Sequence, residues 1–275
     1  PSPLASEFAE PGGKLSMYAG QFPKSFNYHI DNSEVSREFF RLMYETLLTT
    51  DPVTLEDRPG LANRWEISED KLTFTFHLNP EAKWSDGKPI TSEDVVWSFE
   101  AVKNPNHLSG PLQTSMRRLV EIEAVDERTV MIRAEEVHWR NLLACYSFYV
   151  MPKHWWEGQD FNKVNFEFPV VSGPYSFGEV KESVFARLEK REDYWKAGSP
   201  SLEGTLNFDT IEYRFYPQRD IAFEAFKKGE LDVFCVYTSS RWIKETEGDR
   251  FEKNWIVKQK VHNHQPLGFQ GWAMN

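Results

Sequence analysis

Three carboxylates lie close together in the segment WSDGKPITSEDVVWSFE, residues 84–100, where acid–base chemistry would first be sought. Asp86, Glu93 and Asp94 fall within nine positions, and Lys88 lies between them. Two carboxylates act as general acid and general base when their surroundings separate their pKa values. The same residue types are also common in turns and in the first turn of a helix. The flanking sequence must therefore decide between catalysis and architecture.

The flanking residues favour architecture. Thr91 precedes Asp94 by three residues, which is the spacing of a capping box, and Ile90 and Val95 occupy the positions of a hydrophobic staple. We predict that Thr91 caps a helix beginning at the next residue. Acidic residues in the first turn would then complement the helix dipole. Asp86 precedes a glycine, which is a turn signal. None of the three carboxylates is predicted to be catalytic.

Other catalytic and metal-binding motifs are incomplete. The chain has no G-x-S-x-G elbow, and Gly12-Gly13-Lys14 lacks the preceding Gly and the following Ser or Thr of a nucleotide-binding loop. His262 and His264 could ligate a metal from one strand face, but two ligands are too few without a third. We therefore predict no metal and no cofactor. A metal-dependent or glycan-active hydrolase stays as the alternative to a binding protein.

Composition narrows the class of protein. The 275 residues have a net charge of −10 and no dense Lys/Arg run, so no nucleic-acid partner is predicted. No apolar run reaches transmembrane length, and residues 1–14 lack the hydrophobic segment of a signal peptide. A mature exported protein and a cytosolic protein both fit these properties. Aromatic residues make up 15% of the chain, which favours a cleft lined by rings.

The two cysteines give no disulfide framework and no metal-type spacing. Cys145 and Cys235 both lie in apolar stretches, LLACYSF and VFCVY. We predict two buried free thiols. A single bridge between them is the alternative.

The elements that would position these residues form a mixed α/β pattern with substantial antiparallel sheet. Residues 72–78 alternate between apolar and polar and should form a hairpin with the strand around 65–67. A second hairpin is predicted from the alternation over 120–124 and 130–132. The further elements predicted are helices over 138–145 and 220–229, the second ended by Gly229, and strands around 15–20, 184–188, 211–216 and 231–236, the last of them buried.

Several segments occur in an order that matches a known family. They are 61–65 (LANRW), 84–100, 172–180 (SGPYSFGEV), 191–195 (REDYW), 226–233 (FKKGELDV) and 268–275 (GFQGWAMN). Together they resemble the peptide-type (family 5) extracellular solute-binding proteins of ABC importers, from about Leu15 onward. Segments 151–161, 206–216 and 222–232 resemble most closely the subgroup linked to microcin C and longer peptides.

The resemblance implies an α/β fold of the periplasmic binding protein type, class II, with a mixed-sheet domain and a smaller α+β accessory domain. Residues 1–37 and 171–275 would form the discontinuous, ligand-binding domain I, and residues 38–170 the accessory domain. Family members continue beyond the position of Asn275 into a second ligand-binding lobe that closes over the ligand. We expect residues 1–275, which lack that lobe, to bind peptides weakly and to self-associate through exposed apolar surface.

The resemblance also implies a function: an extracytoplasmic or periplasmic subunit that captures oligopeptides and delivers them to an ABC permease. Oligosaccharides and metal chelates are the alternative ligands. Two segments would meet the peptide main chain, as an added strand pairs with the edge of a sheet. The residues implied are Gly20, Gln21 and Phe22 after the first strand, Cys235, Val236, Tyr237 and Thr238 after residue 232, and Trp242 and Trp272 as rings that stack on the ligand or wall the cleft.

Overall fold

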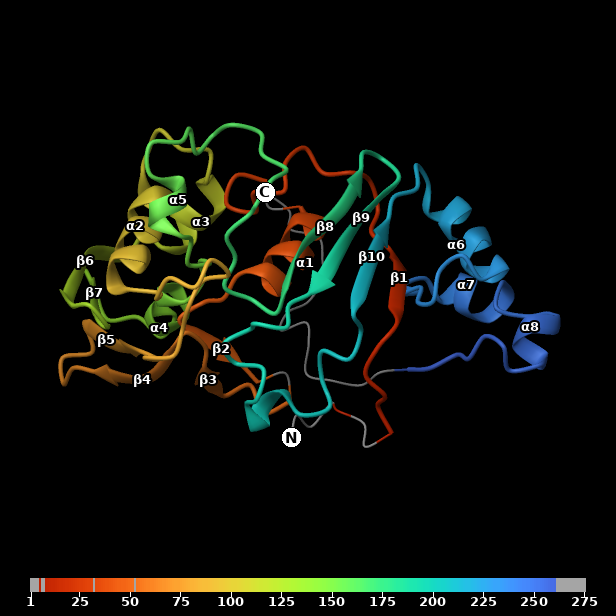
Figure 1. The fold of residues 1–275 in the computed structure, drawn as a ribbon, viewed down its shortest axis with the longest axis horizontal. Coiled ribbons are helices and arrows are strands. Elements are labelled where there is room, and N and C mark those ends of the chain that lie inside the picture. Colours follow the sequence, from red (N-terminus) through yellow and green to blue (C-terminus); the bar gives the residue numbers. More distant parts are fainter. Residues whose placement is uncertain (1–4, 6–7, 32, 52, 261–275) are drawn as a thin grey trace, which may run out of the picture.

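The computed structural model describes residues 5, 8–31, 33–51 and 53–260. The described residues form two separate four-stranded sheets, and helix α1 lies between them in space (Figure 1). The main sheet has the order β1 (Lys14–Tyr18), β10 (Thr210–Arg214), β9 (Phe185–Lys190), β8 (Tyr175–Lys181). The second sheet has the order β4 (Ala62–Ile67), β5 (Thr73–Leu78), β7 (Thr129–Ala134), β6 (Leu119–Asp126).

The main sheet is mixed. β1 and β10 are parallel, whereas the pairs β10–β9 and β9–β8 are antiparallel. β1, β10 and β8 therefore run in the same direction, and their carboxyl ends lie along one edge of the sheet. This edge, called here the carboxyl edge, is at the top of the sheet in Figure 1. It is the edge of an open α/β sheet at which ligands generally bind.

The second sheet confirms both predicted hairpins. β4 pairs with β5 and β6 pairs with β7, all antiparallel. Along β5, Phe74, Phe76 and Leu78 are buried while the intervening residues are half-buried, as the alternation predicts. A short ribbon of β2 (Leu48–Thr50) and β3 (Asp57–Pro59) leads into this sheet.

Helix α1 (Glu34–Met43) packs against the main sheet and the segment that leads to β8. Phe39 lies against the main sheet, with its ring centroid 4.7 Å from that of Tyr213, and the neighbouring Phe40 lies 5.3 Å from Phe168. One cluster of buried apolar residues, from Phe26 to Phe215, includes residues of both sheets. The division predicted between residues 37 and 38 falls inside α1, and the assignment of domains stays a prediction.

Of the remaining helices, α2 and α6 are the longest. α6 and its left-handed Gly229 confirm the predicted helix over 220–229, and α4 confirms a shorter version of the helix predicted over 138–145. None of the helices in the described part is long and apolar enough to cross a membrane. Their bounds are α2 Ser92–Lys103, α3 Gly110–Ser115, α4 Asn141–Cys145, α5 Lys153–Trp156, α6 Arg219–Lys228, α7 Ser239–Lys244 and α8 Asp249–Glu252, with a 3-10 turn at Pro200–Leu202.

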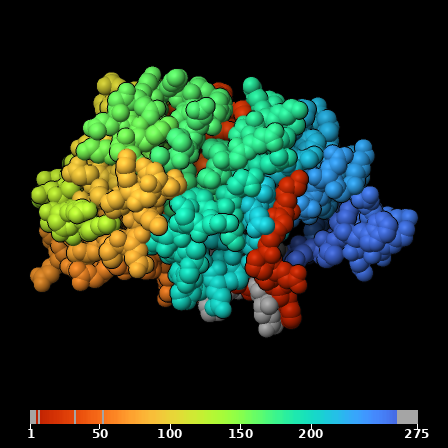
Figure 2. Space-filling view, viewed as in Figure 1, coloured from red at the N-terminus to blue at the C-terminus, as the bar shows by residue number. Residues whose placement is uncertain are grey.

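Two predictions around residue 235 are wrong. Instead of a buried strand over 231–236, the structure has one parallel bridge between Met17 and Val233, and Val233 is 42% exposed. Cys235 is a free but exposed thiol, while Cys145 is free and buried as predicted. An apolar run is buried only where another layer covers it, and in the described chain this segment lies at the sheet edge beyond β1. Figure 2 shows the blue segment that follows it projecting beside β1 (red).

Candidate ligand-binding site

The carboxylates of residues 84–100 are occupied by structural contacts. α2 begins at Ser92, as predicted, with Thr91 as its N-cap. Asp94 is 4% exposed, and its Oδ2 accepts hydrogen bonds from the Thr91 N–H (2.9 Å) and the Trp84 Nε1–H (3.3 Å). Its Oδ1 accepts a hydrogen bond from the Lys153 N–H (2.9 Å). Asp94 therefore ties the start of α2 to the start of α5.

The other two carboxylates also have partners, and Asp86 lies 3.5 Å from Lys88 Nζ. Glu93 lies 2.9 Å from Lys153 Nζ, and Asp86 lies 2.8 Å from His154 Nε2. Partial burial acts to raise the pKa of Asp86, but hydrogen bonds from the Lys88 N–H and from His154 outweigh burial and lower that pKa. These contacts hold α5 against residues 84–100, and this structural role accounts for both carboxylates.

The predicted site segments both reach the carboxyl edge of the main sheet. Gly20 follows β1 in a left-handed conformation (φ 83°) that favours glycine, and its C=O accepts a hydrogen bond from the Tyr216 N–H at 3.2 Å. Gln21 is exposed. Phe22 is half-buried, with its ring 5.0 Å from Phe215 and 5.5 Å from Phe166.

Aromatic rings and one backbone carbonyl from residues 234–237 contact a single arginine. The guanidinium of Arg219, at the start of α6, lies 4.8 Å from the ring centroids of Phe234 and Tyr237 and 5.5 Å from that of Tyr18. Arg219 also donates a hydrogen bond to the C=O of Cys235. Tyr18 stacks on Phe234 with the centroids 5.7 Å apart. We call these five residues the arginine–aromatic cluster.

The cluster leaves part of its surface open. Tyr237 is 75% exposed, and Val236 is half-buried. Partial burial and then the neighbouring Cys235 thiol raise the pKa of Tyr237. Among the described residues, the backbone N–H groups of 235–237 donate no hydrogen bond. They are therefore available to an external acceptor.

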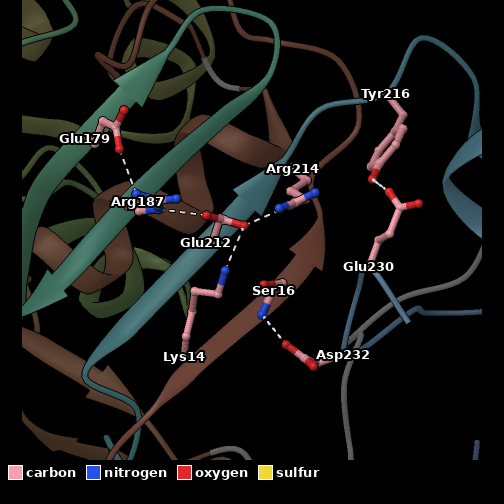
Figure 3. A network of polar contacts seen from close by, with 9 residues as sticks. All are labelled: Lys14, Ser16, Glu179, Arg187, Glu212, Arg214, Tyr216, Glu230 and Asp232. Carbon is pink, nitrogen blue, oxygen red and sulfur yellow. Dashed lines mark hydrogen bonds and ion pairs between the residues drawn. The ribbon is translucent and has the colours of Figure 1, made fainter. Parts of the chain in front are cut away.

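Buried charges fix the sheet beneath this edge (Figure 3). Glu212 of β10 is fully buried and accepts from Arg187 and Arg214 at 2.7 Å and from Lys14 at 3.3 Å. Burial acts to raise its pKa, but these three cations outweigh burial and lower the pKa to about 2. The ionised Glu212 therefore joins β1, β9 and β10.

Asp232 fastens the next segment to the same sheet. Its Oδ2 accepts a hydrogen bond from the Ser16 N–H at 2.7 Å, which holds residues 232–233 against β1 (Figure 3). Tyr216, which follows β10, donates to Glu230 at 3.5 Å. These contacts place the exposed 235–237 backbone next to the end of β1.

Of the two predicted rings, Trp242 is the one that falls within the described residues. Trp242 is a half-buried residue of α7, and Lys258 Nζ lies 4.9 Å from its ring centroid. Thr238 is the N-cap of α7, and its C=O accepts from the Trp242 N–H at 3.1 Å. Within the described residues, no hydrogen bond, ring contact or cation–π contact joins Trp242 or Phe22 to the arginine–aromatic cluster. Trp272 and the pair His262 and His264 lie outside the described residues.

Sequence reasoning missed Tyr18, Arg219 and Asp232. Asp232 follows Gly229 at the end of a predicted helix, and Arg219 lies at the start of that helix. The sequence therefore predicted where both residues lie relative to the helix. The roles of these residues could not be predicted, because they depend on contacts between distant parts of the chain, such as Ser16 with Asp232, 216 positions apart. No cluster of three or more metal-ligating side chains occurs in the part of the chain described.

A pocket away from this edge, with a volume of about 1190 Å³, lies between the end of α1 and residues 194–206. There Glu45 accepts hydrogen bonds from the Tyr194 hydroxyl (2.9 Å) and the Trp195 Nε1–H (2.8 Å). Burial raises the pKa of Glu45 and lowers that of the neighbouring Lys196. The REDYW segment thus supplies the donors that hold a carboxylate between the two sheets.

Comparison with known proteins agrees with this architecture. Residues 57–275 match the family model described as bacterial extracellular solute-binding proteins, family 5 Middle. The probable peptide-binding protein YejA of Agrobacterium fabrum is 33% identical over 231 residues, which cover 81% of this chain and 37% of that protein. The peptidoglycan-binding protein YepA of the same organism is 28% identical over 250 residues, covering 86% and 40%.

Solved structures show the same fold. The substrate-binding protein CtaP of Listeria monocytogenes has a TM-score of 0.69 at 27% identity, over 84% of this chain and 46% of that one. The oligopeptide-binding protein AppA of Bacillus subtilis, solved with a nonapeptide, has a TM-score of 0.73 at 23% identity, over 85% and 46%. The predicted class II periplasmic binding protein fold is confirmed. The chain spans less than half the length of each of these proteins. It belongs to family 5 of the bacterial extracellular solute-binding proteins.

Proposed function

We propose that this chain is the ligand-capturing part of an extracytoplasmic solute-binding protein that takes oligopeptides and delivers them to an ABC permease, without catalysing a reaction. The observation that carries the proposal is the row of backbone N–H groups of residues 235–237 at the carboxyl edge of the main sheet, which donate to no other described residue. An extended peptide could add its own N–H and C=O groups there. Because every peptide has the same backbone groups, such binding tolerates varied side chains.

The contacts of the arginine–aromatic cluster support this role. Arg219 holds the Cys235 carbonyl, and Asp232 holds the chain three residues earlier, so the peptide-facing segment is positioned before ligand arrives. A preformed site reduces the entropy lost on binding. The exposed Tyr237 ring then offers a large apolar surface to the ligand.

The names of relatives support peptide ligands of some length, as in the proposed likeness to the microcin C and long-peptide subgroup. AppA is described with a nonapeptide and one YejA as a probable peptide-binding protein. We also propose that residues 1–37 with 171–275 form domain I and residues 38–170 the accessory domain. The strands of the main sheet come only from 14–18 and 175–214, and those of the second sheet only from 62–134, within the described chain.

Amide hydrogen exchange of the 275-residue chain with and without a mixed pool of five- to nine-residue peptides tests the proposal. We expect slower exchange at residues 235–237 when peptide is present. Val236→Pro, which removes one N–H, should abolish this protection, whereas Val257→Pro, at an exposed position outside any helix or strand, should not.

Two results would overturn the proposal. One is peptide-dependent protection confined to other segments, with residues 235–237 unaffected. The other is cleavage of the pool by the pure chain, measured by mass spectrometry, which would restore the hydrolase alternative.

A further inference from the structure

A pocket at the carboxyl edge has aromatic walls and a rim of one charge. Its volume is about 520 Å³, and four phenylalanines, Phe22, Phe166, Phe168 and Phe177, line it together with Pro169, Gly178 and Val180. The two remaining lining residues are Glu167 and Glu182. No Lys, Arg or His is among the described residues that line it. We call it the phenylalanine pocket.

The walls are held from behind by the core. Phe22 lies 5.4 Å and Phe166 5.3 Å from the fully buried Phe26, while Phe168 lies 6.0 Å from Phe177. Phe166 is nevertheless 37% exposed, so part of its ring is accessible to a ligand. The pocket is therefore preformed, and its rings need not move to accept an apolar stem.

The two carboxylates of the rim are exposed and uncompensated. Glu167 lies in the segment that leads to β8, and Glu182 lies in the turn between β8 and β9. Neither carboxylate forms an ion pair or a hydrogen bond with another described residue. Glu179, three residues before Glu182, contrasts with them because Arg187 neutralises it at 2.7 Å. The rim thus carries two negative charges beside aromatic rings.

We propose that the phenylalanine pocket binds the cationic side chain, Lys or Arg, of a peptide lying along the carboxyl edge. A Lys or Arg side chain has an apolar stem and a charged head, which match the walls and the rim respectively. Aromatic faces attract such a cation, and the unpaired carboxylates add a direct charge interaction. A neutral aromatic side chain would leave both carboxylates unpaired, so the rim selects for a cation.

The position of Phe22 connects this pocket to the proposed peptide path. Its ring lies 5.0 Å from that of Phe215, and the next residue, Tyr216, lies 6.2 Å from Tyr18 of the arginine–aromatic cluster. The pocket lies beside β8 and residues 235–237 lie beside β1, so a peptide that binds both must run along the carboxyl edge across the whole sheet. The inference rests on the proposed function for the peptide, whereas the preference of the pocket for a cation can be measured by itself.

The direct test uses small probes and the ¹⁵N-labelled 275-residue chain. N-acetyl-lysine N′-methylamide and its neutral counterpart N-acetyl-norleucine N′-methylamide are titrated while backbone amide shifts are followed. We expect the lysine probe to shift the amides of residues 166–168 and 177–182 and to bind about tenfold more tightly than the norleucine probe. Raising the salt from 0.05 M to 0.5 M should reduce this preference, because exposed charges are screened.

A pair of matched double variants assigns the preference to the rim. Glu167→Gln with Glu182→Gln should abolish the tenfold preference, while Glu69→Gln with Glu127→Gln, which alters two exposed glutamates in turns of the second sheet, should keep it. Equal binding of the two probes, or a preference that survives the first double variant, would overturn the inference.

A parallel arm separates this inference from the proposed function. Peptides Ala-Ala-Lys-Ala-Ala and Ala-Ala-norleucine-Ala-Ala are compared by hydrogen exchange at residues 235–237. Protection by both peptides without lysine-dependent shifts at 166–182 would remove the cation pocket and leave the peptide function standing. Lysine-dependent shifts without protection at 235–237 by either peptide would keep the pocket as a cation site and remove the peptide function.

Discussion

The segments 84–100 and 231–238 differ in how far the chain itself satisfies their polar groups. In the first, Asp94 has three N–H donors on its carboxylate, Glu93 pairs with Lys153 and Asp86 with Lys88. In the second, the backbone N–H groups of 235–237 have no acceptor among the described residues, and Tyr237 is 75% exposed. We call the charge-rich segment closed, because its carboxylates have partners within the chain. We call the charge-poor segment open, because its backbone N–H groups have none among the described residues.

This contrast reverses the usual expectation that charges mark a site. A buried carboxylate without partners would be costly, so a well-satisfied one indicates architecture. An exposed backbone edge costs little while water solvates it, and it can exchange that water for a ligand. The number of polar groups without a hydrogen-bond or ion-pair partner is therefore a better indicator of binding here than the density of charge. Four substitutions test this comparison.

The largest expected effect is at Asp94. Asp94→Ala leaves the Thr91, Trp84 and Lys153 donors without their acceptor, and we expect it to lower the free energy of unfolding by about 3 kcal/mol. Urea denaturation followed by tryptophan fluorescence measures this. Glu93→Gln, at an exposed ion pair, is the control and should cost less than about 1 kcal/mol. An Asp94→Ala protein of full stability would show that the segment is not closed in the sense described.

The next effect is at Glu212, under the open edge. Glu212→Gln should cost about 2 kcal/mol at pH 7, because three cations lose their common carboxylate. The pKa of Glu212 is about 2 in the folded chain and ordinarily 4.5. The folded state therefore releases this proton more readily, and its contribution to stability is complete above pH 4.5 and is lost as pH falls toward 2.

Unfolding measured between pH 7 and pH 2.5 checks both parts of this prediction. The wild-type chain should lose more stability over this range than the Glu212→Gln chain. Glu189→Gln, which alters a neighbouring carboxylate that accepts from Thr210 rather than from a cation, is the control. Parallel acid profiles for wild type and Glu212→Gln would contradict the assignment.

Thr91→Ala should have a smaller effect, about 1 kcal/mol, because it removes the capping side chain of α2 but leaves Asp94 bonded to the residue 91 N–H. Ligand preference should not change. Thermal unfolding and peptide binding of the same preparation give both readouts. A change in ligand choice would mean that the second sheet takes part in recognition.

The smallest stability effect is expected in the open segment. Tyr237→Ala should leave the free energy of unfolding within about 0.5 kcal/mol of wild type. It should nevertheless weaken peptide binding several-fold, because the exposed ring is lost from the proposed site. Tyr28→Phe serves as a control that should leave binding unchanged. Loss of stability without loss of binding would show that Tyr237 has a structural role and does not bind the ligand.

Local sequence patterns predicted much of the fold. The capping box before α2, the two hairpins of the second sheet and the glycine that ends α6 are interactions between residues close in the chain, and their geometry follows from short-range sterics and hydrogen bonds. The family likeness was carried by such segments as well. These features are confirmed because few alternatives satisfy the same residues locally.

The exposure of residues 233–237 and the partners of Arg219 were decided only by the tertiary structure. The apolar run LDVFCV predicted a buried strand, yet it forms a single bridge to β1 and Cys235 is exposed. Burial depends on what the rest of the chain lays over a segment, and that information is not contained in the segment. For the same reason, the sequence by itself determined where α2 begins and where the two hairpins of the second sheet lie, while contacts between positions some 200 residues apart, such as Ser16 with Asp232 and Lys14 with Glu212, decided which edge stays open for a ligand.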